Sequence, residues 1–246
     1  MTNNPASDKT LRLDKYVASV TDFSRSDVKK LIKAGDIEVD GQVVINPATL
    51  VSSDALLALD GQPLRAATPR YFMLHKPAGF VSATRDKWHP TVMELLHEDN
   101  LERLHIAGRL DADTTGLLLI TDDGQWAHQV MSPKSRCYKR YHVTTEADIP
   151  AAAVERFARG LFLDEEKRRT LPARLEILSP RQAWLEICEG KFHQVKRMFS
   201  ALDNKVVALH RQAVGELELD ETLAEGEYRT LTADEVTMLA REAGND

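Results

Sequence analysis

The chain has 246 residues, 43% of them hydrophobic, which is enough for one large or two modest domains with a well-packed core. No run approaches the roughly 20 apolar residues that span a bilayer, and residues 1–10 lack the apolar stretch of a secretory signal, so we expect a cytoplasmic protein without membrane attachment. The net charge of −6 argues weakly against indiscriminate nucleic-acid binding, but the basic residues are clustered, which favours a polyanionic partner of defined shape.

The beginning of the chain has the pattern of a small separate module. Its expected elements are a helix opening over residues 11–17, a second helix over 25–34 between the cap Ser24 and the terminator Gly35, and a strand, Asp-Gly turn and strand over 37–44. Arg25, Lys29 and Lys33 recur every four residues and so form one exposed basic stripe on the second helix. Charge alone fits a phosphate-binding face and a solvated helix face equally well.

The turn-rich residues 62–69 are expected to be a linker to a larger domain, residues 70–241. In that domain strands are interspersed with helices instead of alternating regularly with them, which favours an α+β fold with a mainly antiparallel sheet. The expected strands include residues 71–75, 117–120, 138–145, 171–178 and 183–188. The expected helices follow a Thr91/Glu94 capping box and the turn 122–124, and one covers residues 150–159.

Residues 108–120 carry the main candidate for a catalytic group. Asp111 stands two positions after Arg109 and before a Thr-Thr-Gly turn that runs into an apolar strand, so the acid is expected at the mouth of a buried sheet. The alternative is that Asp111 or Asp113 only caps a turn through its own backbone. The motifs elsewhere in the chain favour a catalytic Asp111 and leave Asp113 as the turn residue.

A second candidate segment covers residues 189–199. If it is helical, its apolar face is expected to hold Phe192, Val195, Phe199 and Leu202, which sends His193 and Arg197 to the opposite side. An arginine beside a catalytic carboxylate keeps that acid ionised, and the alternative for Arg197 is an ordinary surface position. For His193 a phosphate-binding or structural role is favoured over that of a catalytic base, because nothing pairs with it in the sequence.

Several motifs together resemble two known families. Arg-Leu-Asp-Lys, Ser-Arg-Ser-Asp and Gly-Asp-Ile-Glu-Val-Asp-Gly in residues 12–41 resemble the S4 RNA-binding domain, so Arg12-Leu13-Asp14 is assigned to that module. The segments 76–79, 108–116, 139–141 and 190–199 resemble the ordered motifs of the pseudouridine synthases, and the added S4-like module narrows this to the RsuA-type branch. The resemblance implies an S4-like α/β module over residues 10–61 and a catalytic domain over 70–241 built on a mixed, mainly antiparallel sheet.

The resemblance also implies roles for individual residues. Asp111 would be a buried catalytic carboxylate, Arg197 would keep it charged, and Tyr141 would stack on the extruded base. The remaining assignments are substrate binding by Arg109, Leu209, Lys76 and Lys139, and RNA binding by Arg25, Lys29, Lys33 and Lys196. No cofactor is implied, and the two cysteines, Cys137 and Cys188, have no metal-ligand spacing, so we expect no metal.

The implied activity is conversion of a uridine in 16S ribosomal RNA, uridine 516 by resemblance, to pseudouridine. Asp111 either attacks C1′ or removes the 2′ proton, and the sequence does not choose between these routes. The implied partner is ribosomal RNA, free or in a partly assembled small subunit, bound by a monomer. The alternatives are a related enzyme acting on a 23S stem-loop and a non-catalytic RNA-binding assembly factor.

Overall fold

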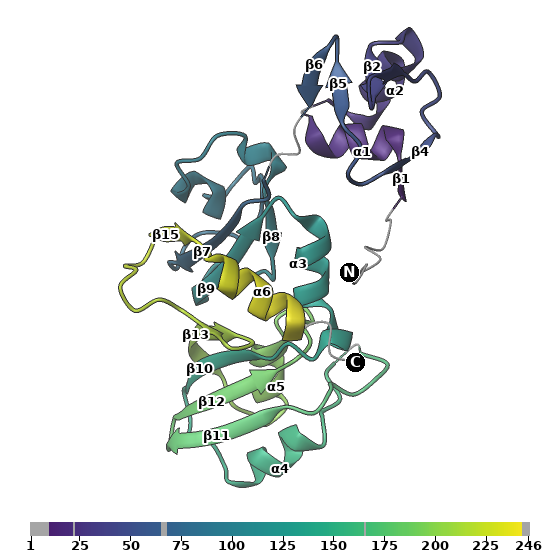
Figure 1. The fold of residues 1–246 in the computed structure, drawn as a ribbon. Coiled ribbons are helices and arrows are strands. Elements are labelled where there is room, and N and C mark those ends of the chain that lie inside the picture. The colour runs from purple at the N-terminus through teal and green to yellow at the C-terminus, as the bar shows by residue number, and fades with distance from the viewer. Residues whose placement is uncertain (1–9, 22, 65–67, 165, 243–246) are drawn as a thin grey trace, which may run out of the picture. The chain divides into compact units, whose positions relative to one another are not determined.

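The structure is a computed structural model that describes residues 10–21, 23–64, 68–164 and 166–242. Its chain contacts divide it into two units, Met1–Thr68 and Pro69–Asp246, each with its own hydrophobic core (Figure 1). None of the helices in these described ranges has the length and apolar character needed to cross a membrane.

The N-terminal unit packs two helices against short strands. Its elements are α1 (Leu13–Val20), α2 (Arg25–Ala34), the pair β1 (Thr10–Arg12) and β4 (Leu50–Ser52), and a sheet in the order β3 (Gln42–Val43), β2 (Ile37–Val39), β5 (Leu57–Leu59) and β6 (Gln62–Leu64). Ser24 caps α2 by accepting a hydrogen bond from Asp27 N, and Gly35 ends it in the left-handed conformation, as predicted. Val28 and Ile32 of α2 are completely buried in the core of this unit.

The predicted linker begins later than residue 62. Residues 62–64 form strand β6, which pairs with β5 through a two-residue turn at Asp60 and Gly61. Both turn residues have positive φ, the geometry that joins antiparallel strands most tightly, so the turn-rich sequence is a hairpin instead of a linker. The rest of the predicted linker includes residues 65–67, which lie outside the described residues.

The larger unit is built on a mixed sheet, which confirms the predicted α+β class. The strands of the main path run in the order β11 (Arg174–Ser179), β12 (Gln182–Ile187), β10 (Lys139–Thr145), β13 (Val206–Val214), β9 (Thr115–Thr121), β7 (Tyr71–Lys76) and β15 (Tyr228–Thr230). Two short strands join its sides, β8 (His105–Ala107) on β9 and β14 (Leu217–Glu218) on β13. Only the β9–β13 pair among these is parallel, so the described sheet is mainly antiparallel.

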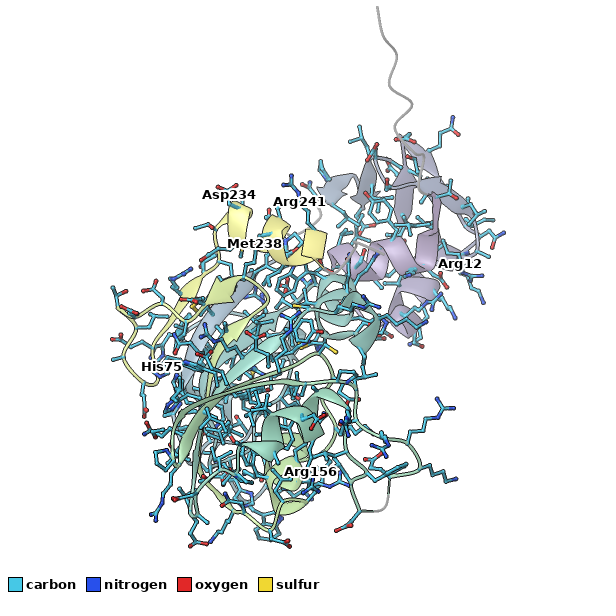
Figure 2. All side chains as sticks on the ribbon, turned by 90° about the horizontal axis from the view of Figure 1, so that it is seen from below. Arg12, His75, Arg156, Asp234, Met238 and Arg241 are labelled. Carbon is cyan, nitrogen blue, oxygen red and sulfur yellow. The ribbon has the colours of Figure 1, made fainter. Side chains whose placement is uncertain are left out.

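Side chains alternate along β7 and β9, so these strands place buried apolar residues on both faces of the sheet. Helices cover both faces. One face packs against α3 (Gly124–Met131) and α6 (Ala233–Glu242), which lie side by side in Figure 1. Met238 of α6, labelled in Figure 2, belongs to this layer. The other face packs against α4 (Ala152–Ala158) and α5 (Gln194–Ser200).

Among the described residues of this unit, three short 3₁₀ helices lie in the connections: Val92–Leu95, Leu101–Arg103 and Pro133–Ser135. The first begins at the predicted capping box, in which Glu94 Oε1 accepts a hydrogen bond from Thr91 N at 2.8 Å. This box fixes the segment that follows β7 and returns the chain toward β8.

Candidate active site

A cavity of about 800 Å³ opens where the loops after β7 and β8 meet strands β10 and β13 and the segment before α5. Its lining combines polar groups with apolar side chains, as is typical of a site that binds a small organic molecule. The predicted site residues on this lining are Arg109, Asp111, Lys139, Tyr141, Lys196 and Leu209.

Asp111 occupies the first position of a tight turn just before β9. The backbone carbonyl of Asp111 accepts a hydrogen bond from Thr114 N at 3.1 Å, which places Asp113 inside the turn. Gly79, in the turn after β7, donates its N–H to the Ala112 carbonyl at 2.7 Å and so ties two loops together. The acid therefore projects from a loop that is held at both ends.

Lys76 binds this loop from the buried side and does not line the cavity. It is completely buried, and its Nζ donates hydrogen bonds to the carbonyls of Pro77, Ala112 and Thr114 at 2.9, 3.3 and 2.8 Å. Burial lowers the pKa of Lys76 to about 8. The structure contradicts the prediction that Lys76 binds substrate, because its ammonium group is bound by the backbone carbonyls of Pro77 and of Ala112 and Thr114, which follow Asp111 in the chain.

The Asp111 carboxylate has two basic neighbours. Lys196 Nζ lies 3.1 Å from Oδ2 and His193 Nε2 lies 3.4 Å from Oδ1, while 29% of the Asp111 side chain remains exposed. Burial lowers the pKa of Lys196, but its hydrogen bonds to Asp113 and Asp111 outweigh that effect and raise it. A buried carboxylate was predicted, but the Asp111 carboxylate is partly exposed. It lies at the cavity wall, paired with Lys196 and His193.

Arg197, predicted beside Asp111, lies elsewhere. Its guanidinium pairs with Glu166 at 3.3 Å and donates to the carbonyls of Asp164 and Phe192. Glu166 also pairs with Lys191 at 3.1 Å, so these groups join the loop before β11 to the segment before α5. The prediction failed: the preceding residue of the helix, Lys196, faces the acid instead.

The helix also begins later than predicted. The α5 helix starts at Gln194, and His193 precedes it with a φ of 47°, so the helical pattern does not extend back to Phe192. Phe192 is therefore not part of the apolar face: 75% of it is exposed, and its ring stacks on the ring of His193 at 3.8 Å. Val195 and Phe199 are buried, as predicted.

Tyr141 and Leu209 form an apolar wall of the cavity on the adjacent strands β10 and β13. Both side chains are 8% exposed, and Val143 of β10 is the direct partner of Leu209. Arg109 is exposed at the cavity rim. Lys139 lines the cavity with its stem, while its Nζ donates to the Cys137 carbonyl at 2.6 Å, and burial lowers its pKa.

Arg211 is a site residue that the sequence analysis missed. It is 2% exposed and lines the cavity, where its guanidinium donates to the carbonyls of Leu117 and Gly108 at 2.8 and 2.7 Å and to the Tyr141 hydroxyl at 3.5 Å. The signal was present, since alternation along β13 puts Arg211 on the same face as the buried Leu209.

The predicted basic stripe on α2 is arranged around a buried acid. Asp14 is completely buried, and Arg25 and Lys29 approach it at 3.1 and 4.0 Å while staying about half exposed. Arg12 completes the arrangement at 3.1 Å. Hydrogen bonds from Arg12 hold the pKa of Asp14 well below its usual range, although burial opposes this. Lys33 is exposed at the end of α2.

No group of three or more His, Cys, Asp or Glu side chains within the described ranges is arranged to hold a metal ion. The cavity lining offers acid–base and electrostatic groups of the protein itself, among them the Asp111 carboxylate with its two basic neighbours beside an apolar wall.

Comparisons with known proteins match both units. The family model for RNA pseudouridylate synthase matches residues 70–201, and that for the S4 domain matches residues 11–57. The ribosomal small subunit pseudouridine synthase A of Vibrio parahaemolyticus is 48% identical over 228 residues, which is 92% of this chain and 98% of that protein. The Escherichia coli protein of the same name is 48% identical over 227 residues, again 92% of this chain and 98% of that protein.

A crystal structure of a pseudouridylate synthase has a TM-score of 0.69 and 43% identity to this chain, and the match covers 93% of this chain and 99% of that one. The chain therefore belongs to the RNA pseudouridylate synthase family and carries an S4 domain in its N-terminal unit. It is a pseudouridine synthase, an isomerase that acts on RNA, which confirms the resemblance found in its motifs.

Proposed function

We propose that this enzyme isomerises a specific uridine of 16S small-subunit ribosomal RNA, uridine 516 by resemblance, with Asp111 as the catalytic carboxylate. The observation that carries the choice of RNA is the 48% identity, over 92% of the chain, to relatives named as small-subunit enzymes. The choice of Asp111 is supported by its place on the cavity wall between Lys196 and His193.

The reaction exchanges one bond to the sugar for another. The C1′–N1 bond breaks, the freed uracil rotates, and a C1′–C5 bond forms; C5 loses a proton and N1 gains one, so the composition is unchanged. Asp111 starts the reaction either by attacking C1′ or by removing the 2′ proton. Both routes need an ionised carboxylate at a fixed position, and Lys196 supplies a positive charge 3.1 Å away.

The target uridine has to leave the RNA stack to reach this carboxylate. We propose that Tyr141 and Leu209 receive the extruded base, since both form the apolar wall of the cavity. Their contacts offset an unstacking cost of a few kcal/mol. Arg109 contacts an RNA phosphate from the rim. Lys139, predicted to bind substrate, is instead assigned with Arg211 to holding the cavity wall in shape, because both are buried and donate to backbone carbonyls.

RNA docking is assigned to the S4 domain, predicted at residues 10–61 and extended here to residue 64 because β6 belongs to its sheet, and catalysis to residues 70–241. The supporting feature is the stripe of Arg25, Lys29 and Lys33, whose exposed parts leave N–H groups for phosphates. A monomer working in the cytoplasm, on ribosomal RNA or on a partly assembled small subunit, fits this division.

The decisive experiment maps pseudouridine on 16S and 23S ribosomal RNA, free and in small-subunit particles, after incubation with the purified protein. One modified position in 16S RNA, absent with Asp111→Asn, is the expected result. Modification confined to 23S RNA would reassign the enzyme to a related large-subunit target, and RNA binding without any pseudouridine would overturn the proposed reaction.

A further inference from the structure

The loop of residues 83–90, between β7 and the first 3₁₀ helix, carries the most exposed large apolar side chain in the part of the chain that the structure describes. Trp88 is 86% exposed. An indole left in water gives up the stabilisation that burial of a large aromatic side chain provides, so a binding function is the natural explanation of its position.

The loop holds Trp88 in a defined conformation. Asp86 Oδ1 accepts hydrogen bonds from Trp88 N at 2.8 Å and from His89 N at 2.9 Å, and His89 Nδ1 lies 3.1 Å from the same oxygen. The two backbone donors lower the pKa of the Asp86 carboxyl. The only acid of the loop is thus occupied in shaping it, and the turn is ordered before any ligand binds.

The base of this loop is fastened to the active-site cavity. Val81, which lines the cavity, donates its N–H to the Pro90 carbonyl at 2.9 Å. Ser82, also on the lining, exchanges two hydrogen bonds with Leu110, the residue before Asp111, at 2.8 and 3.0 Å. Trp88 is two residues from Pro90, so its Cα lies within about 7 Å of that anchor.

The charge around Trp88 is positive. Arg85 and Lys87 are exposed on the same short loop, and the carboxylate of Asp86 accepts hydrogen bonds from the backbone N–H groups of Trp88 and His89. An exposed indole between cationic side chains matches the two parts of an unpaired nucleotide, because the base stacks on the aromatic ring while the phosphate pairs with the cations. A protein partner gives no comparable reason for both features.

We propose that Trp88, with Arg85 and Lys87, is a stacking platform for an unpaired nucleobase of the substrate RNA close to the target uridine. The proposal rests on the proposed function, since it needs RNA at the Asp111 cavity. Trp88 then contributes to where the RNA is held and not to the bond exchange itself.

The test compares RNA affinity with the rate of a single turnover at saturating RNA, for the full chain. Stacking of a base is worth about 1–3 kcal/mol, so Trp88→Leu is expected to weaken binding of a single-stranded or loop-containing substrate about tenfold. Trp88→Phe keeps a ring and recovers most of this affinity. The rate at saturation stays within about threefold of the unsubstituted enzyme in both variants.

Phe162→Leu is the matched control. Phe162 is 61% exposed in the same unit, but its ring lies under Arg169 at 4.8 Å and it lines a different hollow, with Arg156 and Arg159. This variant is expected to bind RNA unchanged. Equal weakening by both substitutions would show a general effect of surface aromatic residues and would overturn the platform.

Tryptophan fluorescence gives an independent reading. Trp126 is 5% exposed and Trp184 is partly buried under Arg140, so acrylamide quenching in the free protein comes mainly from Trp88. RNA binding is expected to protect this signal, and Trp88→Phe to remove the protected component. Unchanged affinity of Trp88→Leu, or self-association through Trp88 without RNA, would overturn the proposal.

Failure of the proposed function is separable from failure of the platform. If the enzyme forms no pseudouridine in ribosomal RNA, the proposed function is wrong, while the affinities of the Trp88 variants still decide whether the loop binds RNA. If pseudouridine forms but Trp88→Leu lowers only the saturated rate, the platform is wrong and the function stands.

Discussion

The tripeptide Arg-Leu-Asp occurs once in each unit, and the two copies have opposite fates. In the N-terminal unit Arg12 turns back onto Asp14, which is completely buried beneath basic side chains (Figure 2 labels Arg12). In the catalytic unit Arg109 is exposed at the cavity rim, and Asp111 stays 29% exposed, paired with Lys196. The same three residues build a structural ion cluster in one place and a cavity-facing acid in the other.

The difference comes from the elements that follow each copy. Leu13 and Asp14 begin helix α1, so the acid is turned toward α2 and its basic residues. Asp111 begins a turn that ends in β9, and Lys76 fixes that turn from the buried side. A carboxylate surrounded on all sides stabilises the fold, whereas one held only from behind keeps an open side for a substrate.

The largest expected effect separates the two acids by activity. Asp111→Asn keeps the size of the side chain but removes its charge, so pseudouridine formation is expected to fall by at least about 10³-fold, with RNA affinity within about tenfold. The measurement is single-turnover formation of pseudouridine with separate RNA-binding titrations.

Asp113→Asn is the matched control for that substitution. Asp113 is 72% exposed, and its Oδ1 lies 2.6 Å from Nζ of Lys196, the lysine that also pairs with Asp111. Asp113→Asn therefore removes one negative charge at the same lysine. A rate within about tenfold of the unsubstituted enzyme is expected. Normal turnover by Asp111→Asn would remove the acid from the mechanism altogether.

The next effect tests which basic residue serves Asp111. Lys196→Met removes the cation 3.1 Å from the carboxylate and is expected to lower the single-turnover rate about 10²-fold, because the acid loses its fixed position and its counter-charge. Arg197→Met breaks the contact with Glu166 and is expected to cost less than tenfold. The reverse order of effects would restore Arg197 as the partner of the acid.

This pair of substitutions also marks how far the sequence could predict the site. Strong local signals were reliable: Ser24 and Gly35 bound α2, and the Thr91/Glu94 box begins a short helix. The irregular order of strands and helices correctly predicted an α+β fold with a mainly antiparallel sheet. The motif around Asp111 and its family likeness gave the correct class of enzyme.

The errors arose where geometry depends on contacts across the fold. A single residue with positive φ, His193, delays the start of α5, and across the fold Lys196 pairs with Asp111 while Arg197 pairs with Glu166. Lys76 has the sequence context of a substrate-binding residue, yet its ammonium group is captured by three carbonyls. Neither a helical wheel nor a sequence motif predicts where Asp111, Glu166 or these carbonyls lie relative to the basic side chains.

A smaller effect concerns the cations around the other acid. Replacing Arg25, Lys29 and Lys33 together with glutamine is expected to weaken RNA binding about tenfold and to reduce the salt dependence of log affinity by about 2. The saturated rate is expected to stay unchanged, because these residues belong to the other unit. Affinity is measured over a series of salt concentrations, and an unchanged slope would assign the stripe to solvent.

The smallest effect on activity is expected from the acid of the first tripeptide. Asp14→Asn leaves Arg12 and Arg25 without their buried counter-charge, so the N-terminal unit is expected to lose stability while the saturated rate stays within about threefold. Hydrogen exchange of backbone amides in residues 13–37, compared with residues 70–241 of the same chain, measures this loss. Asp54→Asn, in an exposed turn, serves as the control.

The pH dependence of this stability gives the sharper reading. The pKa of Asp14 is lower in the folded unit than in the unfolded chain, so in acid the unfolded chain binds more protons and stability falls as pH drops below about 4. Above that pH the stabilisation is fully present. Asp14→Asn is expected to remove this acid-sensitive part, and the same acid sensitivity in the variant would show that Asp14 is not the structural counterpart of Asp111.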